Sequence, residues 1–386
     1  MTPNYLFHNA HIITPQRSYE PGWLLTRGGQ IALIGSGAPP QFPDANRIDA
    51  HGLLLLPGFI DLHAHGGNGY ECMDATPEAL RGIAQFYAQH GVTGFLATTW
   101  TASRERIQTA LDLIREMQGP QMGGATLLGA HVEGPYLNPD RCGAQDSRSI
   151  RRADRDEALA FLESGVVRLL ALAPEYEANQ WLIDTCTERG ITSSAAHTAA
   201  TYEDMQHAVA HGLSHSTHTF NAMTGLHHRN PGTVGAVLSM KEITCELIAD
   251  LIHVHPAVMQ ILLAAKGLDR VVLITDAVRG AGLTEGSTYS QDGRSVHIHD
   301  GGAYLPDGTL AGSILTMDRA LHNFSQAVNQ PITDLWPTSS LNAARAIHLA
   351  HRTGSIEVGK DADLILVNED VQVYLTMARG QVVYQR

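Results

Sequence analysis

The sequence predicts an α/β protein: a TIM-like (β/α)8 barrel with a small β-sandwich domain built from both termini. Short apolar segments alternate with helix-like segments through the middle of the chain. Ionisable side chains recur where these apolar segments end, on the face where such barrels carry their chemistry. Short strand-like segments with Gly and Pro between them occupy both ends of the chain. Neither end holds enough strands for a stable sheet alone, so we expect residues 1–55 and 350–386 to form one domain and residues 56–349 the barrel.

The barrel prediction depends on eight apolar segments in the central region. They are residues 59–65, 94–99, 127–133, 168–174, 191–197, 214–220, 245–253 and 271–277. The alternative is an open, doubly wound sheet, but the Gly-rich turn that a nucleotide site would need there is missing from the sequence.

Helix signals fall between these segments. Thr76 followed by Pro77 predicts a helix start, with Thr as N-cap. Asp154 and Glu157 have the spacing of a capping box. Three glycines are placed to end helices, namely Gly165, Gly190 and Gly212.

Composition limits the function classes. The chain has 386 residues, 44% hydrophobic and 17% charged, which excludes wholesale disorder. The net charge of −13 argues against a nucleic-acid binder, and we find no apolar window suited to a membrane span. Four cysteines without a CxxC pair, and a start without a signal-peptide pattern, lead us to expect a cytoplasmic protein.

Histidine is abundant, with 21 copies, and several copies predict a metal site. His63 and His65 stand two apart at a predicted strand end, so alternation directs both imidazoles to one face. Glu133 ends the third apolar segment, and its carboxylate can ligate one cation or bridge two. His197 and His218 end two further segments. Together these side chains form a candidate ligand set for one or two divalent ions.

Asp276 ends the last predicted barrel strand and is the candidate catalytic group. An Asp beside a metal-activated water can take its proton and pass it to a leaving nitrogen. Some metal hydrolases bridge two ions with a carboxylated lysine at a strand end. None of the three lysines ends a predicted barrel strand; they are Lys241, Lys266 and Lys360. A residue that bridges two ions would therefore have to be Glu133.

Other polar residues carry weaker signals. Arg229 lies on the loop after the sixth predicted strand and His253 ends the seventh, and the two could bind an anionic group at the barrel mouth. Cys142 lies on the loop after Glu133, and no pattern around it supports a nucleophilic role.

At these residues the chain resembles a known family. The segments PGFIDLHAHG and GSIEVGKDADLIL are similar to the opening and closing motifs of the amidohydrolase superfamily. Between them, HVEGPYLNPDRCGAQ, AAHTAATYEDM, THTFNAM, HRNPG, ITDA and LAGSILTM resemble the N-acetylglucosamine-6-phosphate deacetylase family, and the resemblance covers nearly the whole chain. It implies hydrolysis of N-acetyl-D-glucosamine 6-phosphate to D-glucosamine 6-phosphate and acetate, in amino-sugar catabolism.

The resemblance also assigns roles to residues. Glu133, His197 and His218 match the family's metal ligands, Asp276 matches its catalytic acid/base, and His63 and His65 are retained here although some members lack them. The expected substrate contacts are Ala144, Gln145, Asn221, Ala222, Arg229, Asp250, His253, Leu310, Ala311 and Gly312. Some members carry a histidine where Gln145 stands. The amide of Gln145 can donate a neutral hydrogen bond to an oxyanion but cannot become a cation.

The resemblance leaves several questions open. His and carboxylate ligands suit Zn²⁺, our first expectation, but also Fe²⁺, Co²⁺ and Mn²⁺. The family usually forms homodimers, and Arg229 could then serve the neighbouring subunit's active site. The alternatives for function are a deacetylase for N-acetylgalactosamine 6-phosphate or another N-acyl compound and, more remotely, a non-catalytic assembly protein on the same scaffold.

Overall fold

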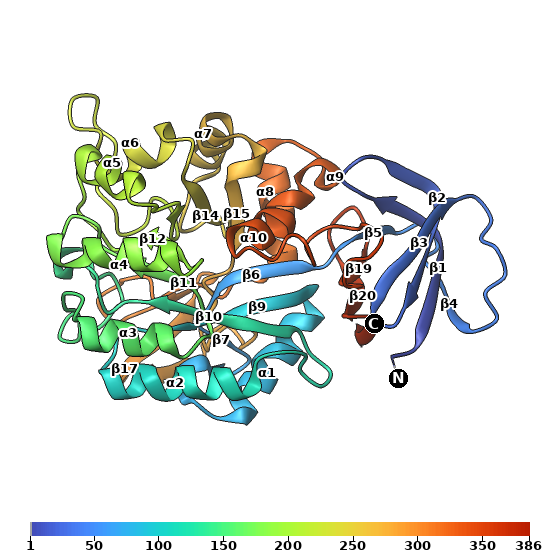
Figure 1. Ribbon diagram of the computed structural model, residues 1–386, viewed down its shortest axis with the longest axis horizontal. Helices are drawn as coiled ribbons and strands as arrows, with labels where there is room; N and C mark the ends of the chain where they lie inside the picture. The colour runs from blue at the N-terminus through green and yellow to red at the C-terminus, as the bar shows by residue number, and fades with distance from the viewer. Residues whose placement is uncertain (1) are drawn as a thin grey trace.

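A computed structural model describes residues 2–386 and contains the predicted barrel (Figure 1). Within these residues, eight parallel strands pair in the order β15-β14-β13-β12-β11-β10-β9-β6. Each coincides with one of the eight apolar segments. The strands are β6 (Phe59–Ala64), β9 (Val92–Thr99), β10 (Thr126–Glu133), β11 (Val167–Leu172), β12 (Thr192–Ala195), β13 (His215–Ser216), β14 (Thr244–Ile248) and β15 (Val271–Ile274).

Backbone contacts join the two outer strands of this sheet. The amide of Asp276 donates to the carbonyl of His63 at 2.9 Å, and the amide of His65 donates to the carbonyl of Ala277 at 2.9 Å. These bonds bring the carboxyl ends of β6 and β15 together. Two expected site positions, 63 and 276, therefore become neighbours across the closing seam.

Helices cover the outside of the barrel, and two begin at the predicted caps. Thr76 accepts a hydrogen bond from the Ala79 amide at the start of α1, and Asp154 accepts one from the Glu157 amide at the start of α3. The predicted capping box is only half formed, because the Glu157 carboxylate accepts from Tyr136 and Arg151 instead. The helices are α1 (Pro77–Gln89), α2 (Arg104–Met117), α3 (Arg155–Glu163), α4 (Glu177–Glu188), α5 (Tyr202–Ala210), α6 (Gly232–Ser239), α7 (Pro256–Lys266), α8 (Met317–Val328), α9 (Ile332–Leu335) and α10 (Leu341–Ala346).

Three helices end where glycine was predicted to end them. Gly165, Gly190 and Gly212 follow α3, α4 and α5, and each has a positive φ. Short 3-10 turns occupy residues Cys72–Asp74, Pro139–Arg141, Leu268–Arg270 and Trp336–Ser339.

Both ends of the chain meet in a second sheet, as expected. β5 pairs antiparallel with β19, which joins the N-terminal strands to the C-terminal ones. The sheet comprises β1 (Asn4–Ile13), β2 (Ser18–Arg27), β3 (Gln30–Ser36), β4 (Ala45–Asp49), β5 (Leu54–Pro57), β19 (Leu364–Val367), β20 (Val373–Ala378) and β21 (Gln381–Gln385). The chain leaves it after β5 and enters the barrel with β6, so the carboxyl ends of the barrel strands face away from this sheet (Figure 1).

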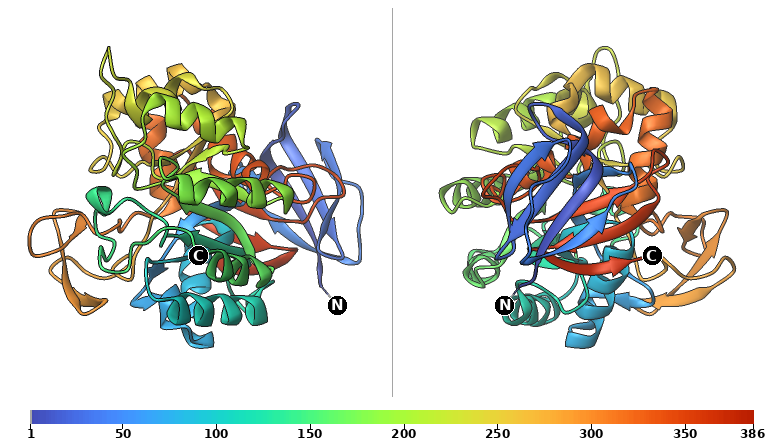
Figure 2. Two further views of the ribbon diagram at one scale, coloured as in Figure 1. Left: turned by 60° about the vertical axis from the view of Figure 1, so that its left-hand side comes forward. Right: turned by 90° about the vertical axis from the view of Figure 1, so that its right-hand side faces the viewer.

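A three-stranded insertion stands at the opposite end of the molecule from the terminal sheet (Figure 2, left). It consists of β16 (Thr288–Gln291), β17 (Arg294–His299) and β18 (Gly302–Tyr304). Its buried Val296 and Ala303 pack in one cluster with Trp100 and Ala144 from the barrel loops. The insertion therefore packs against loops that follow the barrel strands. A two-stranded pairing of β7 (Gly66–Gly67) with β8 (Tyr70–Glu71) lies after β6.

Apolar side chains fill the rest of the molecule in the expected way. One large cluster joins the barrel strands to their helices, and a smaller one lies within the terminal sheet. Among the helices of residues 2–386, none has the length and apolar character needed to cross a membrane.

Candidate metal and active site

The predicted site residues meet at the carboxyl ends of the barrel strands. His63 lies within β6, and Glu133 is the last residue of β10. His197, His218 and Asp276 each follow a strand by two residues, where the backbone turns. These three have φ values of 42°, 29° and 50°, a left-handed region that is unfavourable for residues with a Cβ.

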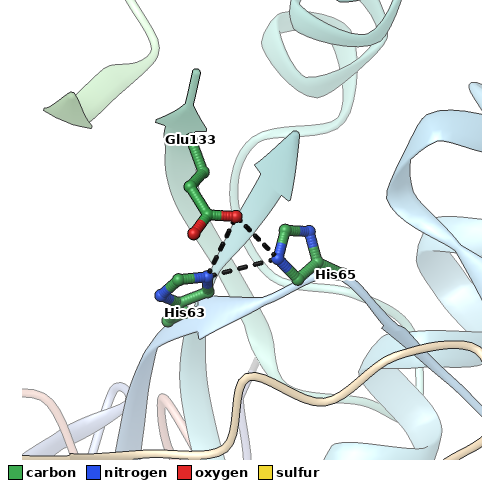
Figure 3. A group of neighbouring side chains, drawn as sticks. All are labelled: His63, His65 and Glu133. Atoms are coloured by element: carbon green, nitrogen blue, oxygen red, sulfur yellow. Dashed lines mark hydrogen bonds and ion pairs between the residues drawn. The ribbon is translucent and has the colours of Figure 1, made fainter. Parts of the chain in front are cut away.

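Glu133 divides its two carboxylate oxygens between two pairs of histidines. Its Oε1 lies 3.0 Å from His218 Nε2 and 3.3 Å from His197 Nε2. Its Oε2 lies 3.2 Å from His65 Nε2 and 3.6 Å from His63 Nε2 (Figure 3). Glu133 therefore stands between two separate ligand groups, each with two imidazole nitrogens.

The spacing of these donor atoms fits divalent metal ions. The Nε2 atoms of His63 and His65 are 3.2 Å apart, and those of His197 and His218 are 3.1 Å apart. Tetrahedral ligation at a metal–nitrogen distance of about 2.0 Å places neighbouring ligand nitrogens about 3.3 Å apart. All of these side chains are buried, and the set of imidazoles and a carboxylate matches the preference of Zn²⁺ and similar ions.

Hydrogen bonds on the far side of the rings leave Nε2 free to ligate. His197 Nδ1 lies 2.8 Å from the carbonyl of Arg141, which can only accept, so Nδ1 carries the proton. His63 Nδ1 lies 3.1 Å from a carboxylate oxygen of Glu246. Both rings therefore direct Nε2, the nitrogen that a metal ion would bind, towards Glu133.

Asp276 lies against the pair His63 and His65. Its Oδ1 is 3.4 Å from His63 Nε2 and 3.3 Å from His65 Nε2. Burial favours the neutral acid, but the two imidazoles outweigh it and hold the pKa of Asp276 below its ordinary value. Burial is likewise outweighed at Glu133, where His63, His197 and His218 hold the pKa well below its usual range. Both carboxyls are therefore ionised and can act as a ligand or as a base.

A cavity of about 180 Å³ opens above these residues. Most of the expected substrate contacts line it. The lining includes Glu133, His197, His218 and Asp276, together with Trp100, Gly143, Ala144, Gln145, Asn221, Ala222, His253, Thr309, Leu310 and Gly312.

Three expected substrate contacts lie elsewhere. Asp250 is behind His253, where its Oδ2 lies 2.6 Å from His253 Nδ1. Ala311 is fully buried beneath the cavity wall. Arg229 is on an exposed loop, contacts His228, and lines a different cavity together with Tyr202.

Gln145 is held at both ends of its amide. Its Nε2 donates to Glu133 Oε2 at 2.6 Å, and its Oε1 accepts from the Thr101 amide at 2.8 Å. The side chain thus fixes the orientation of the Glu133 carboxylate. In this arrangement Gln145 supports Glu133.

The loop that carries Gly312 packs closely against the backbone of Asp276. Its φ is 68°, and a Cβ there would lie 2.4 Å from a methyl group of Val278 and 2.9 Å from the Asp276 carbonyl. Only glycine fits this position without a shift of the backbone that carries Asp276.

Sequence reasoning missed two residues at the site. Trp100 follows β9 directly, stacks on His65 with ring centroids 3.7 Å apart, and donates its indole N–H to Glu71. Its place directly after a strand was a usable signal, because the expected metal ligands were found by their positions at predicted strand ends. Glu246 lies inside an apolar strand, where its position carried no such signal.

Comparisons with known proteins agree with this geometry. Residues 54–383 match the model of the amidohydrolase family. The N-acetylglucosamine-6-phosphate deacetylase of Bacillus subtilis (strain 168) is 37% identical over 390 residues, covering 100% of this chain and 98% of that protein. The N-acetylgalactosamine-6-phosphate deacetylase of Escherichia coli O157:H7 is 35% identical and covers 96% of this chain and 99% of its own length.

A solved structure has the same architecture. It is a variant of N-acetyl-D-glucosamine-6-phosphate deacetylase from Mycobacterium smegmatis, in complex with N-acetyl-D-glucosamine-6-phosphate. The TM-score is 0.91 at 29% identity, with 99% of this chain and 100% of that chain covered.

Proposed function

The chain belongs to the amidohydrolase family, and we propose that it is a metal-dependent deacetylase of N-acetyl-D-glucosamine 6-phosphate. The products are D-glucosamine 6-phosphate and acetate. Full-length relatives with this activity in their names support the substrate. The barrel, the cavity and the buried ligand groups support the reaction class.

One observation carries the proposal: the Asp276 carboxylate lies within 3.4 Å of the Nε2 atoms of His63 and His65 and also lines the cavity. His63, His65, Glu133, His197 and His218 would hold one or two divalent ions, which would supply Lewis-acid activation of water and of the acetyl carbonyl. Asp276 accepts the proton of the attacking water at Oδ1. The same carboxyl then donates that proton to the leaving nitrogen, which departs as an amine.

The cavity walls serve the sugar phosphate. His253 is held by Asp250, and although burial disfavours its charged form, that carboxylate raises the pKa of His253 above its ordinary value. A protonated imidazole at the cavity wall suits an anionic substrate. Asn221 lines the same wall and supplies an amide.

The finer features of this proposal follow the same family. We assign Zn²⁺ to the site, a homodimer to the assembly and the cytoplasm to the location. In such a dimer Arg229 of one subunit completes the phosphate site of the other.

The test is acetate release from purified protein of known metal content. We expect turnover of N-acetyl-D-glucosamine 6-phosphate and little turnover of unphosphorylated N-acetyl-D-glucosamine. Removal of metal with a chelator should abolish turnover, and Zn²⁺ should restore it. Metal-replete protein that releases no acetate would overturn the proposal and favour a non-catalytic role.

N-acetylgalactosamine 6-phosphate is the second candidate substrate, favoured by the 35% identity to a deacetylase of that sugar. The two substrates differ in the orientation of one hydroxyl group. The ratio of their kcat/KM values decides between them, and we expect it to favour the gluco sugar.

A further inference from the structure

Glu246 is a completely buried carboxylate below the candidate metal site. It lies in β14 between apolar neighbours and has no exposed surface. A buried carboxylate is strongly unfavourable unless its oxygens are paired. Its pairing therefore indicates what it does.

Both oxygens of Glu246 are engaged. Oε2 lies 3.1 Å from His63 Nδ1 and accepts from the backbone amide of His218 at 3.1 Å. Oε1 lies 3.2 Å from His215 Nε2. One carboxylate thus contacts the side chain of one ligand and the backbone of another, and these ligands belong to different groups around Glu133.

The contact with His63 decides which ring nitrogen is available. A carboxylate accepts but does not donate, so His63 Nδ1 carries the proton and Nε2 is left to bind a cation. An acidic partner of this kind also makes the imidazole a more basic ligand.

The contact with His218 acts on the second group. His218 has a φ of 29°, so its backbone needs support to keep this conformation. The Glu246 oxygen provides a charged acceptor for its amide. Glu246 therefore contacts a ligand of each group, and it does so without lining the cavity.

We propose that Glu246 is a positioning residue that fixes one ligand from each group of the metal site, His63 and His218. His215 pairs with its remaining oxygen. The inference rests on the proposed metal-dependent function. It assigns no contact with substrate to Glu246.

Glu246→Gln is a close test of this role. The amide carbonyl can occupy the place of Oε2 and accept from His63 and His218, while the amide N–H₂ donates to His215 Nε2. Geometry is retained and the negative charge is lost. The control is Glu157→Gln, because Glu157 is also a buried carboxylate, 6% exposed, but it pairs with Arg151 and Tyr136 outside the site.

Each full-length protein is stripped of metal and titrated with Zn²⁺ against a chromogenic chelator. Loss of an outer hydrogen-bond partner of a ligand weakens metal affinity by about 10- to 100-fold. We expect that loss for Glu246→Gln and parental affinity for Glu157→Gln. Visible spectra of the Co²⁺-loaded proteins should show altered ligand-field bands for Glu246→Gln only.

The outcomes separate this inference from the proposed function. A parent protein that binds no metal overturns both. A parent that binds metal, together with a Glu246→Gln protein of equal affinity and identical Co²⁺ spectrum, overturns the positioning role alone. His63, His131 and Glu246 also lie close enough together to bind an ion themselves. If the parent binds three metal equivalents and Glu246→Gln binds two, Glu246 is a ligand and the positioning role is overturned. If Glu246→Gln does not fold, Glu246→Asp keeps the charge but not the reach, and parental affinity there refutes the role.

Discussion

The geometry of Asp276 combines a ligand environment with an open face. Its Oδ1 is within 3.4 Å of two imidazole nitrogens, yet the residue also lines the cavity. A group that takes a proton from the attacking water must be reachable from the cavity, and Asp276 meets this requirement. This position supports the assignment of proton transfer to Asp276.

Replacing Asp276 by Asn tests that assignment. The amide fills the same space but cannot carry a proton between water and the leaving nitrogen. We expect kcat to fall by about 10²- to 10⁴-fold, the usual contribution of general acid–base catalysis, while substrate affinity changes little. Steady-state kinetics, substrate titration and metal analysis of the same preparation separate the effects.

Near-parental kcat in Asp276→Asn would contradict this role. The proton transfer would then belong to another side chain in the cavity, with His197 and His253 as the candidates. A large loss of bound metal in the variant would instead assign Asp276 to the ligand set.

At the residue level, sequence reasoning succeeded where strand geometry alone decides position. His63 and His65 share a face because side chains alternate along a strand, and Glu133 ends its strand. It did not find Glu246, because a hydrogen bond across the barrel depends on packing in three dimensions. The two engaged ends of Gln145 were hidden for the same reason.

At the level of elements, all eight predicted barrel strands are present, including β13, which is only two residues long. Its neighbours and the barrel closure define it more than its own sequence does. The three-stranded insertion lies outside the eight apolar segments that predict the barrel. Its packing against Trp100 and Ala144, which line the cavity, is a long-range contact that local sequence patterns do not reveal.

A side-chain hydrogen bond connects the insertion to a loop that lines the cavity. Arg294 in β17 donates to the carbonyl of Ala144 at 2.7 Å. Replacement by Ala should loosen the loop that carries Ala144 and Gln145. A hydrogen bond of a charged group contributes about 1.5 to 3 kcal/mol, so we expect KM to rise by about tenfold or more, with a smaller change in kcat.

A matched variant is available in the same part of the molecule. Arg106 pairs with Asp292 next to β17, but the arginine is half exposed, and surface ion pairs contribute little. Arg106→Ala should therefore behave like the parent in the same kinetic assay. If both variants raise KM equally, the insertion as a whole shapes the cavity, without a special role for Arg294.

At the level of the whole molecule, Arg229 is an expected substrate contact that lines a different cavity of its own chain. It lies on an exposed loop. The sequence placed it at the barrel mouth but could not tell to which copy it belongs. In the proposed homodimer, it reaches the cavity of the partner.

Mixing two impaired variants at a low substrate concentration tests this arrangement. Arg229→Ala should raise KM for the phosphorylated sugar by an amount equivalent to roughly 2 to 5 kcal/mol, and it should barely affect the unphosphorylated sugar. When the Arg229→Ala and Asp276→Asn proteins are denatured and refolded together in equal amounts, half of the dimers contain one chain of each variant. Each mixed dimer holds one complete site, so activity should return to about a quarter of the parental rate.

Refolding each variant alone is the control and should restore nothing. A mixture that stays inactive while forming mixed dimers would place Arg229 in its own subunit's site or in a structural role. Size-exclusion chromatography of differently tagged chains verifies that mixed dimers are present.

The left-handed backbone at positions 197, 218 and 276 has an evolutionary consequence. Each such conformation disfavours the fold by about 1 to 3 kcal/mol in a residue with a Cβ, and glycine or asparagine adopts it more easily. A lineage released from selection for catalysis would therefore gain thermal stability by drifting to glycine at these three positions. The backbone conformation that catalysis uses at these positions therefore lowers the stability of the fold. Descendants that had lost the reaction would be recognised by glycines just after β12, β13 and β15.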